Sequence, residues 1–234
     1  MRELFDRYGI SITPDQEEML KRYFDLLVSW NEKINLTSIT SYDDVLIKHF
    51  LDSALLLSSS VDGFDLKPEA RMIDVGTGAG FPGMVLGILK PEWDIVLLDS
   101  LNKRVEFLND VIIELSLKNV MAIHGRAEDL ARDEKYRIGF DLVVSRAVAD
   151  MSLLLELCIP FVSDEGCFVA YKGPKFSDEL SLSSHAMDEL KVKHLFENSF
   201  DLAGADRTLV FFVRDGELPE KYPRRAGIPA KRPL

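Results

Sequence analysis

Four glycines lie within eight residues, between a short apolar run and the start of a predicted helix. The segment reads Asp-Val-Gly-Thr-Gly-Ala-Gly-Phe-Pro-Gly at positions 74–83. Glycine adopts backbone conformations that other residues avoid, so this spacing is typical of a tight turn that leaves room for a ligand. A strand, a glycine-rich turn and a helix in this order indicate an α/β fold that binds a nucleotide at the carboxyl ends of its strands.

The rest of the chain supports this fold class. After position 71, short apolar runs alternate with helical stretches, which predicts a seven-stranded, mostly parallel, doubly wound sheet of the Rossmann-like type. The strands are expected at residues 72–75, 94–98, 120–123, 141–144, 167–171, 193–196 and 209–213. The last two should form an antiparallel hairpin, because the link between them is too short for a parallel crossover. One more helix is expected between residues 178 and 190.

A helical leader is expected ahead of the sheet, at residues 1–68, packed on a catalytic domain at residues 69–234. Thr13 and Gln16 have the spacing of a capping box, which predicts a helix over residues 14–30. Gly63 is expected near the end of the leader. The apolar face of a second leader helix is formed by Val45, Leu46, Phe50, Ala54 and Leu57.

Composition excludes several other classes of protein. Apolar residues make up 47% of the chain and charged residues 29%, which is typical of a globular domain. The longest apolar run, residues 153–162, is too short to cross a membrane and contains Glu156. Cys158 and Cys167 are the only cysteines, so neither a disulfide framework nor a metal site is expected. We expect a cytoplasmic protein; the oligomeric state stays open, with a monomer as the default.

Charge is distributed unevenly along the chain. Residues 221–234 contain five of the 28 basic residues and none of the 39 acidic ones, so the net charge of −11 splits into a tail of +5 and a body of −16. A basic segment on an acidic protein is typical of contact with a polyanion, and indicates nucleic acid as a partner.

The glycine-rich segment satisfies two different cofactor motifs. Gly78, Gly80 and Gly83 have the spacing of a dinucleotide fingerprint, and Asp99 lies 19 residues beyond Gly80, where a ribose-binding acid is expected. With Asp74 ahead of it, the same segment is also typical of methyltransferases that use S-adenosylmethionine. NAD and S-adenosylmethionine are therefore both candidates.

Charge favours S-adenosylmethionine. A pyrophosphate brings negative charge to the loop, whereas S-adenosylmethionine brings a sulfonium and an ammonium group. The Asp74 carboxylate would repel the first and attract the second. Pro82 also removes one backbone N–H from the region that a pyrophosphate would use.

The residues after the fourth predicted strand narrow the chemistry. Enzymes that methylate an amino group carry an Asn/Asp-Pro-Pro-aromatic turn here, and those that methylate carbon 5 of a pyrimidine need a nucleophilic cysteine. Ser145, Arg146 and Ala147 occupy this position instead, and both cysteines lie in apolar segments. A ring nitrogen with a free lone pair needs neither device, so positioning and charge would suffice for its methylation.

Several motifs together resemble the RsmG family, also called GidB. They are the segment at 74–83, Asp99-Ser100-x-x-Lys103-Arg104-x-x-Phe107-Leu108, Ser145-Arg146-Ala147, Lys172-Gly173, Trp30-Asn31, Asn35-Leu36-Thr37, His49-Phe50-Leu51-Asp52-Ser53 and the tail beginning Tyr222-Pro223-Arg224-Arg225. The resemblance runs from about Tyr23 to the C-terminus. It implies transfer of a methyl group to N7 of a guanine in bacterial small-subunit ribosomal RNA, with the ribosomal RNA or a ribosomal particle as partner.

The resemblance also implies roles for individual residues. The cofactor is expected to contact Asp74, Gly76, Thr77, Gly78, Gly80, Phe81, Asp99, Ala127, Glu128 and Arg146. Arg146 and Lys172 are expected to act at the methyl-transfer site; the alternatives are a surface salt bridge for Arg146 and a solvated loop lysine for Lys172. The role of His49, Asp52 and Ser53, which can share one helix face, stays open.

Arg224, Arg225 and Lys231 of the tail are expected to contact RNA. The competing interpretation is a structural clasp, in which the tail packs against the leader and its arginines pair with acids of the body. Two alternatives for the whole protein also stay open: a methyltransferase acting on another RNA or a small molecule, and a non-catalytic RNA-binding module.

Overall fold

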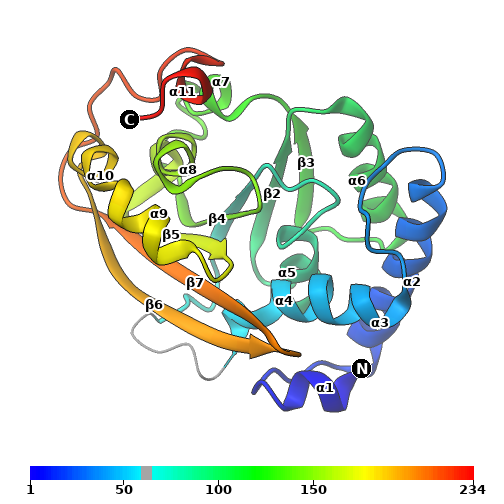
Figure 1. The fold of residues 1–234 in the computed structure, drawn as a ribbon. Coiled ribbons are helices and arrows are strands. Elements are labelled where there is room, and N and C mark those ends of the chain that lie inside the picture. The colour runs from blue at the N-terminus through cyan, green and yellow to red at the C-terminus, as the bar shows by residue number, and fades with distance from the viewer. Residues whose placement is uncertain (59–64) are drawn as a thin grey trace.

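Seven strands form one sheet in the computed structural model, which describes residues 1–58 and 65–234 (Figure 1). They are β1 (Arg71–Val75), β2 (Asp94–Asp99), β3 (Val120–His124), β4 (Phe140–Arg146), β5 (Val162–Lys172), β6 (Val192–Leu202) and β7 (Ala205–Arg214). Their order is β3-β2-β1-β4-β5-β7-β6, and the first five are parallel. The predicted fold class is confirmed. Gly63, expected near the end of the leader, lies outside the described residues.

β6 and β7 form the predicted antiparallel hairpin. β7 lies between β5 and β6 and pairs antiparallel with both. Ala203 and Gly204 connect the two strands with φ values of 53° and 82°. Positive φ at both central residues is typical of a tight hairpin turn that matches the twist of the strands.

Each face of the sheet is covered, and alternate residues of a strand enter two separate cores (Figure 1). In β1, Met72 belongs to the core that contains the leader, α5 (Gly83–Leu89) and α6 (Asn102–Glu114). Ile73 belongs to the other core, with α7 (Ala127–Leu130), α8 (Met151–Cys158) and the C-terminal tail. Burial on both faces explains why the parallel strands are almost continuously apolar.

The leader contains the predicted helices and two features that were not predicted. α2 (Pro14–Asn31) begins with the expected capping box between Thr13 and Gln16. The second helix is continuous but irregular: α3 (Tyr42–Val45), the π-helical η1 (Leu46–Leu51), α4 (Asp52–Ala54) and η2 (Leu55–Leu57). A short α1 (Arg2–Asp6) precedes both helices and is anchored by the fully buried Phe5.

The single helix expected between residues 178 and 190 is two helices, α9 (Phe176–Leu182) and α10 (Ser184–Leu190). Ser183 separates them, with a fully buried side chain whose hydroxyl donates to the Leu180 carbonyl at 2.7 Å. A serine that bonds the backbone of the preceding turn competes with helical hydrogen bonds, which accounts for the break.

The C-terminal tail packs on the face opposite the leader, so the competing interpretation, a clasp against the leader, is wrong about the surface that the tail contacts. Tyr222 and Leu234 join the core of α7 and α8. Arg137 donates to the Tyr222 carbonyl at 2.8 Å, and the Tyr222 hydroxyl donates to Glu189 of α10 at 2.5 Å. α11 (Ile228–Lys231) then lies beside α7 and α8 (Figure 1).

Arg224 fastens the tail to the body through a buried carboxylate. Glu156 of α8 has no exposed surface. The Arg224 backbone N–H donates to it at 2.9 Å, and the guanidinium adds bonds of 2.8 Å from Nε and 2.5 Å from Nη2. This geometry favours the structural interpretation of Arg224 over RNA contact.

Two classes of feature do not occur in the part of the chain that the structure describes. No helix there combines the length and the apolar character that a bilayer requires. No group of three or more His, Cys, Asp and Glu side chains is gathered there as metal ligands would be.

The Arg224–Glu156 pair gives a test of this tail packing. We expect Arg224→Ala to lower the free energy of unfolding by about 3 kcal/mol, because it leaves a buried carboxylate without its cation. The matched control is Arg225→Ala, which removes an exposed neighbouring arginine and should change stability by less than about 0.5 kcal/mol. Urea denaturation at neutral pH measures both. Equal stabilities of the two variants would contradict the role assigned to Arg224.

Candidate active site

The glycine-rich loop leaves β1 in a conformation that requires glycine. Gly76, Gly78 and Gly80 have φ values of 74°, 63° and 94°. At Gly80 a Cβ atom would also lie 2.5 Å from the Tyr23 hydroxyl, which donates to the Ala79 carbonyl. The leader therefore braces the loop from outside the sheet.

Asp74 holds the loop from inside. Its side chain is fully buried, and Oδ2 accepts from the Thr77 hydroxyl at 2.6 Å and from the Gly83 N–H at 2.8 Å. The other oxygen, Oδ1, is buried without a hydrogen-bond partner among the described residues. Burial raises the pKa of this carboxyl to about 6. An unpartnered buried oxygen fits a site that is completed by a cationic ligand.

A first cavity, of about 210 Å³, lies at the carboxyl ends of β1, β2 and β3. Gly76, Asp99, Ala127 and Glu128 line it, as expected of cofactor-binding residues. Asp99 is 2% exposed, and its two oxygens accept from the N–H groups of Gly78 and Leu101, each at 2.9 Å. Asp99 thus both links the loop to the start of α6 and faces the cavity.

Glu128 is the second acid of this cavity. It lies in the first turn of α7 and is 8% exposed. Its Oε1 accepts from the Gly227 backbone N–H of the tail at 3.0 Å. The cavity wall is therefore connected to the C-terminal tail.

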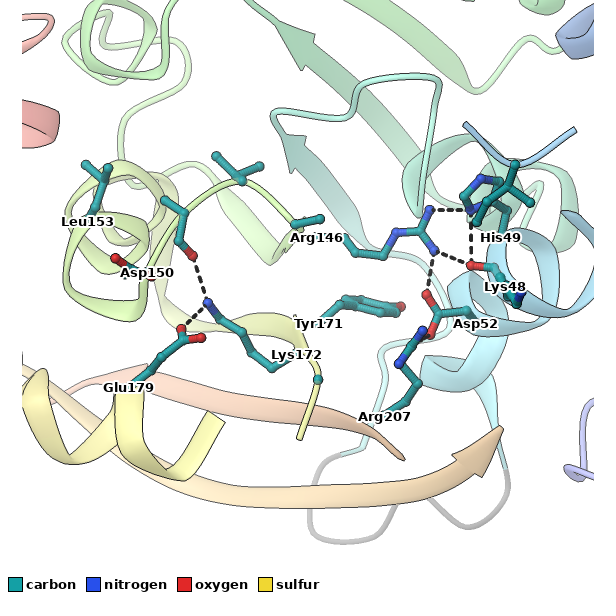
Figure 2. Close-up of a pocket in the computed structure, with 15 residues that line it drawn as sticks. Lys48, His49, Asp52, Arg146, Asp150, Leu153, Tyr171, Lys172, Glu179 and Arg207 are labelled. Atoms are coloured by element: carbon teal, nitrogen blue, oxygen red, sulfur yellow. Dashed lines mark hydrogen bonds and ion pairs between the residues drawn. The ribbon is translucent and has the colours of Figure 1, made fainter. Parts of the chain in front are cut away.

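A second and larger cavity, of about 770 Å³, shares the lining residue Val148 with the first. Figure 2 shows the residues that line this second cavity. Arg146, at the end of β4, projects into it and meets the leader: Nη1 donates to Asp52 at 2.5 Å and to the Lys48 carbonyl at 3.3 Å. The guanidinium also lies over the Phe81 ring, 5.1 Å from its centroid. Arg146 is thus neither exposed nor a surface salt bridge, because its partner Asp52 is 3% exposed.

His49 completes this cluster in its neutral form. Its ring stacks on Phe81, with centroids 4.5 Å apart. Nδ1 lies 3.1 Å from the Lys48 carbonyl and 3.4 Å from Nη2 of Arg146, and Nε2 lies 2.9 Å from the Thr37 hydroxyl. Burial and the adjacent Arg146 lower the pKa of His49 to about 4.

Val148 lies between the two cavities and lines both. Its Cγ2 would be 2.6 Å from a Cβ atom at Gly76, so the loop after β4 rests directly on the glycine-rich loop. A group bound in the first cavity can therefore meet a group bound in the second at Gly76 and Val148.

Lys172, at the end of β5, lines the second cavity but already has two partners (Figure 2). Its ammonium donates to the Ala149 carbonyl at 2.8 Å and to Glu179 of α9 at 2.6 Å. The side chain is 9% exposed, so it is not a solvated loop lysine. It ties the loop after β4 to α9.

The structure places part of the predicted site residues on the two cavities: Gly76, Asp99, Ala127, Glu128, Arg146 and Lys172. The other predicted cofactor residues line neither cavity and belong to the end of β1 and the glycine-rich loop: Asp74, Thr77, Gly78, Gly80 and Phe81. Arg225 and Lys231 are exposed and line neither cavity, and Ser53 is buried away from both. Arg207 of β7 was missed: it contacts Asp52 at 3.3 Å from the side opposite Arg146. No sequence pattern marks it, because its place depends on β7 pairing with β5.

Comparisons with known proteins identify the family. The profile of the family described as "GidB: rRNA small subunit methyltransferase G" matches residues 16–210. A ribosomal RNA small subunit methyltransferase G of Lachnoclostridium phytofermentans is 45% identical over 228 residues, covering 97% of this chain and 93% of that protein. The chain belongs to this family. A Clostridium perfringens protein with the same description is 42% identical, over 100% of this chain and 97% of its own.

Solved structures support the fold. The structure described as M. jannaschii TYW2 in complex with AdoMet superposes with a TM-score of 0.55 at 14% identity, over 76% of this chain and 79% of that one. The YcgJ protein from Bacillus superposes with a TM-score of 0.52 at 14% identity, over 72% of this chain and 100% of that one. The predicted resemblance is confirmed, and membership of a methyltransferase family decides between the two cofactors in favour of S-adenosylmethionine.

Asp74 gives a pH-dependent test of the site. With a pKa raised from 3.8 to about 6, the folded protein keeps a proton that the unfolded chain has released, so this group's contribution to stability is present below about pH 4 and is lost as the pH rises through 6. The difference between a pKa of 3.8 and one of about 6 corresponds to about 3 kcal/mol. We expect the unfolding free energy of Asp74→Asn, measured relative to the natural protein, to rise by about that amount from pH 4 to pH 7.5. Urea denaturation across this range measures it, and a difference that is constant with pH would contradict the assignment.

Proposed function

We propose that the protein transfers the methyl group of S-adenosylmethionine to N7 of a guanine in small-subunit ribosomal RNA of bacteria. The observation that carries this proposal is identity of 42–45% over nearly the whole chain with proteins described as ribosomal RNA small subunit methyltransferase G. The two adjoining cavities support it, because methyl transfer needs a cofactor and an acceptor that meet at one point.

The first cavity and the loop beneath it are suited to hold the cofactor. S-adenosylmethionine supplies an electrophilic methyl group on a cationic sulfonium. Asp74 provides a buried anion with an unpartnered oxygen beside the loop, and Asp99 provides a carboxylate for ribose hydroxyls. Glu128 and Ala127 line the part of the cavity that would receive the adenine.

The second cavity is suited to hold the acceptor base. Guanine N7 is an unprotonated acceptor at neutral pH, so the site needs no base to remove a proton. Arg146 is fixed between Asp52 and Phe81, where it can donate to the base or its phosphate. Neutral His49 adds no positive charge beside a purine that becomes cationic on methylation.

Lys172 contributes to this reaction by positioning. Its bond to the Ala149 carbonyl fixes the loop that carries Val148 across the junction of the two cavities. Catalysis by Lys172 itself is not required by this arrangement, since its ammonium is already paired with Glu179.

The RNA contact outside the cavity is assigned to Arg225 and Lys231, two of the exposed cations of the tail. They lie beside an acidic body that would otherwise repel a polyanion. Arg224 is left out of this role because Glu156 occupies its guanidinium. A ribosomal RNA substrate implies a cytoplasmic protein.

The proposed chemistry predicts a flat pH profile. Since no proton is abstracted from N7 and His49 titrates near pH 4, the single-turnover rate with bound RNA should change less than about threefold between pH 6.5 and 8.5. A rate that rises tenfold per pH unit would indicate proton abstraction and contradict methylation at N7.

Arg146→Ala should lower the single-turnover rate about 10²-fold, by misplacing the base, and weaken cofactor binding far less.

A further inference from the structure

One hydrogen bond joins the C-terminal tail to the wall of the cofactor cavity. The Gly227 N–H donates to Oε1 of Glu128 at 3.0 Å. No other group in the described part of the chain bonds the Glu128 carboxylate, so Oε2 is left for a ligand in the cavity. The two residues are 99 positions apart in the sequence, and the contact depends on the path of the tail over α8 and α7.

The donor is held rigidly. Three residues earlier, Arg224 is fixed to the fully buried Glu156 by both its backbone and its guanidinium. Gly227 itself has a φ of 80°, a conformation that favours glycine, and is the N-cap residue of α11. The Ile228 N–H closes a turn onto the Arg225 carbonyl at 3.0 Å, and Pro229 is buried. The N–H is therefore set in place by contacts that do not involve Glu128.

We infer that the tail is part of the cofactor site: the Gly227 N–H orients the Glu128 side chain so that its free oxygen accepts from the 6-amino group of the adenine. The inference rests on the proposed cofactor and goes beyond it, because it assigns selection for a 6-amino purine to a backbone group of the tail. Gly227 acts as a positioning residue, through Glu128.

The substitution Glu128→Gln distinguishes a side chain that the tail orients from one that only contributes negative charge to the cavity. In Glu128→Gln, the fixed N–H donor can bond only the oxygen of the new side-chain amide, so the amide NH2 would then face the purine. An NH2 group opposes the 6-amino group of adenine but donates to the 6-oxo group of hypoxanthine. If the tail did not orient the side chain, the amide would turn its oxygen toward the adenine, and the preference for adenine would remain.

The experiment measures dissociation constants of S-adenosylhomocysteine and S-inosylhomocysteine by calorimetry, for the full-length natural protein, Glu128→Gln and the exposed control Glu134→Gln. We expect the natural protein and the control to bind the adenine compound at least about tenfold more tightly. In Glu128→Gln this preference should fall at least about tenfold, because the contact at position 6 changes while the N1–H of hypoxanthine is the same in every variant. Thermal melting confirms that each variant is folded.

Each outcome bears on a separate claim. An undiminished preference for adenine in folded Glu128→Gln would overturn the inference, as would equal binding of both compounds by the natural protein. Binding of neither compound by the natural protein would instead contradict the proposed cofactor. If Glu128→Gln fails to fold, amide hydrogen exchange of the natural protein is the second measurement. The Gly227 amide should exchange with solvent at least about tenfold more slowly than the unbonded amide of a flexible chain. Exchange at the unprotected rate would overturn the inference.

Discussion

Buried carboxylates organise this protein. Asp52, Asp74, Asp99, Glu128 and Glu156 are each less than a tenth exposed. A buried carboxylate is costly unless donors meet it, so each one fixes the chain segments that supply those donors. Asp74 and Asp99 hold the glycine-rich loop, Asp52 holds Arg146, and the two glutamates hold the tail.

These attachments bring distant segments to the same edge of the sheet. Asp52 and His49 come from the leader on one face, whereas Gly227 reaches the edge from the tail on the other face. Val148 and Gly76 lie against each other between these two segments, after β4 and β1. β1 and β4 are neighbours in the sheet, and their other neighbours, β2 and β5, lie on opposite sides of the pair. The crevice at this reversal of strand order is where open α/β sheets bind their ligands. Here the leader supplies part of the lining, and the tail contacts the lining residue Glu128.

Local patterns were sufficient to predict the sheet and the loop, whereas features that depend on tertiary pairing were not predictable. Alternating apolar runs predicted all seven strands, and the Thr13 capping box predicted the start of α2, because both depend on neighbours in the sequence. Arg207 reaches Asp52 only because β7 inserts beside β5. The break at Ser183, where the hydroxyl bonds the Leu180 carbonyl, and the π-helical turn of η1 leave the apolar periodicity unchanged, so the periodicity did not predict them. The boundary at residue 68 between leader and catalytic domain stays a prediction.

The central claim is the atom that is methylated. Ribosomal RNA from cells with and without this protein can be reduced with borohydride, cleaved with aniline at 7-methylguanine and mapped by mass. If the protein methylates N7 of a guanine, one cleavage site in the small-subunit RNA should disappear without the protein and return when the protein is supplied. An unchanged cleavage pattern, with loss of a methyl group from another base or from the large subunit, would contradict this claim.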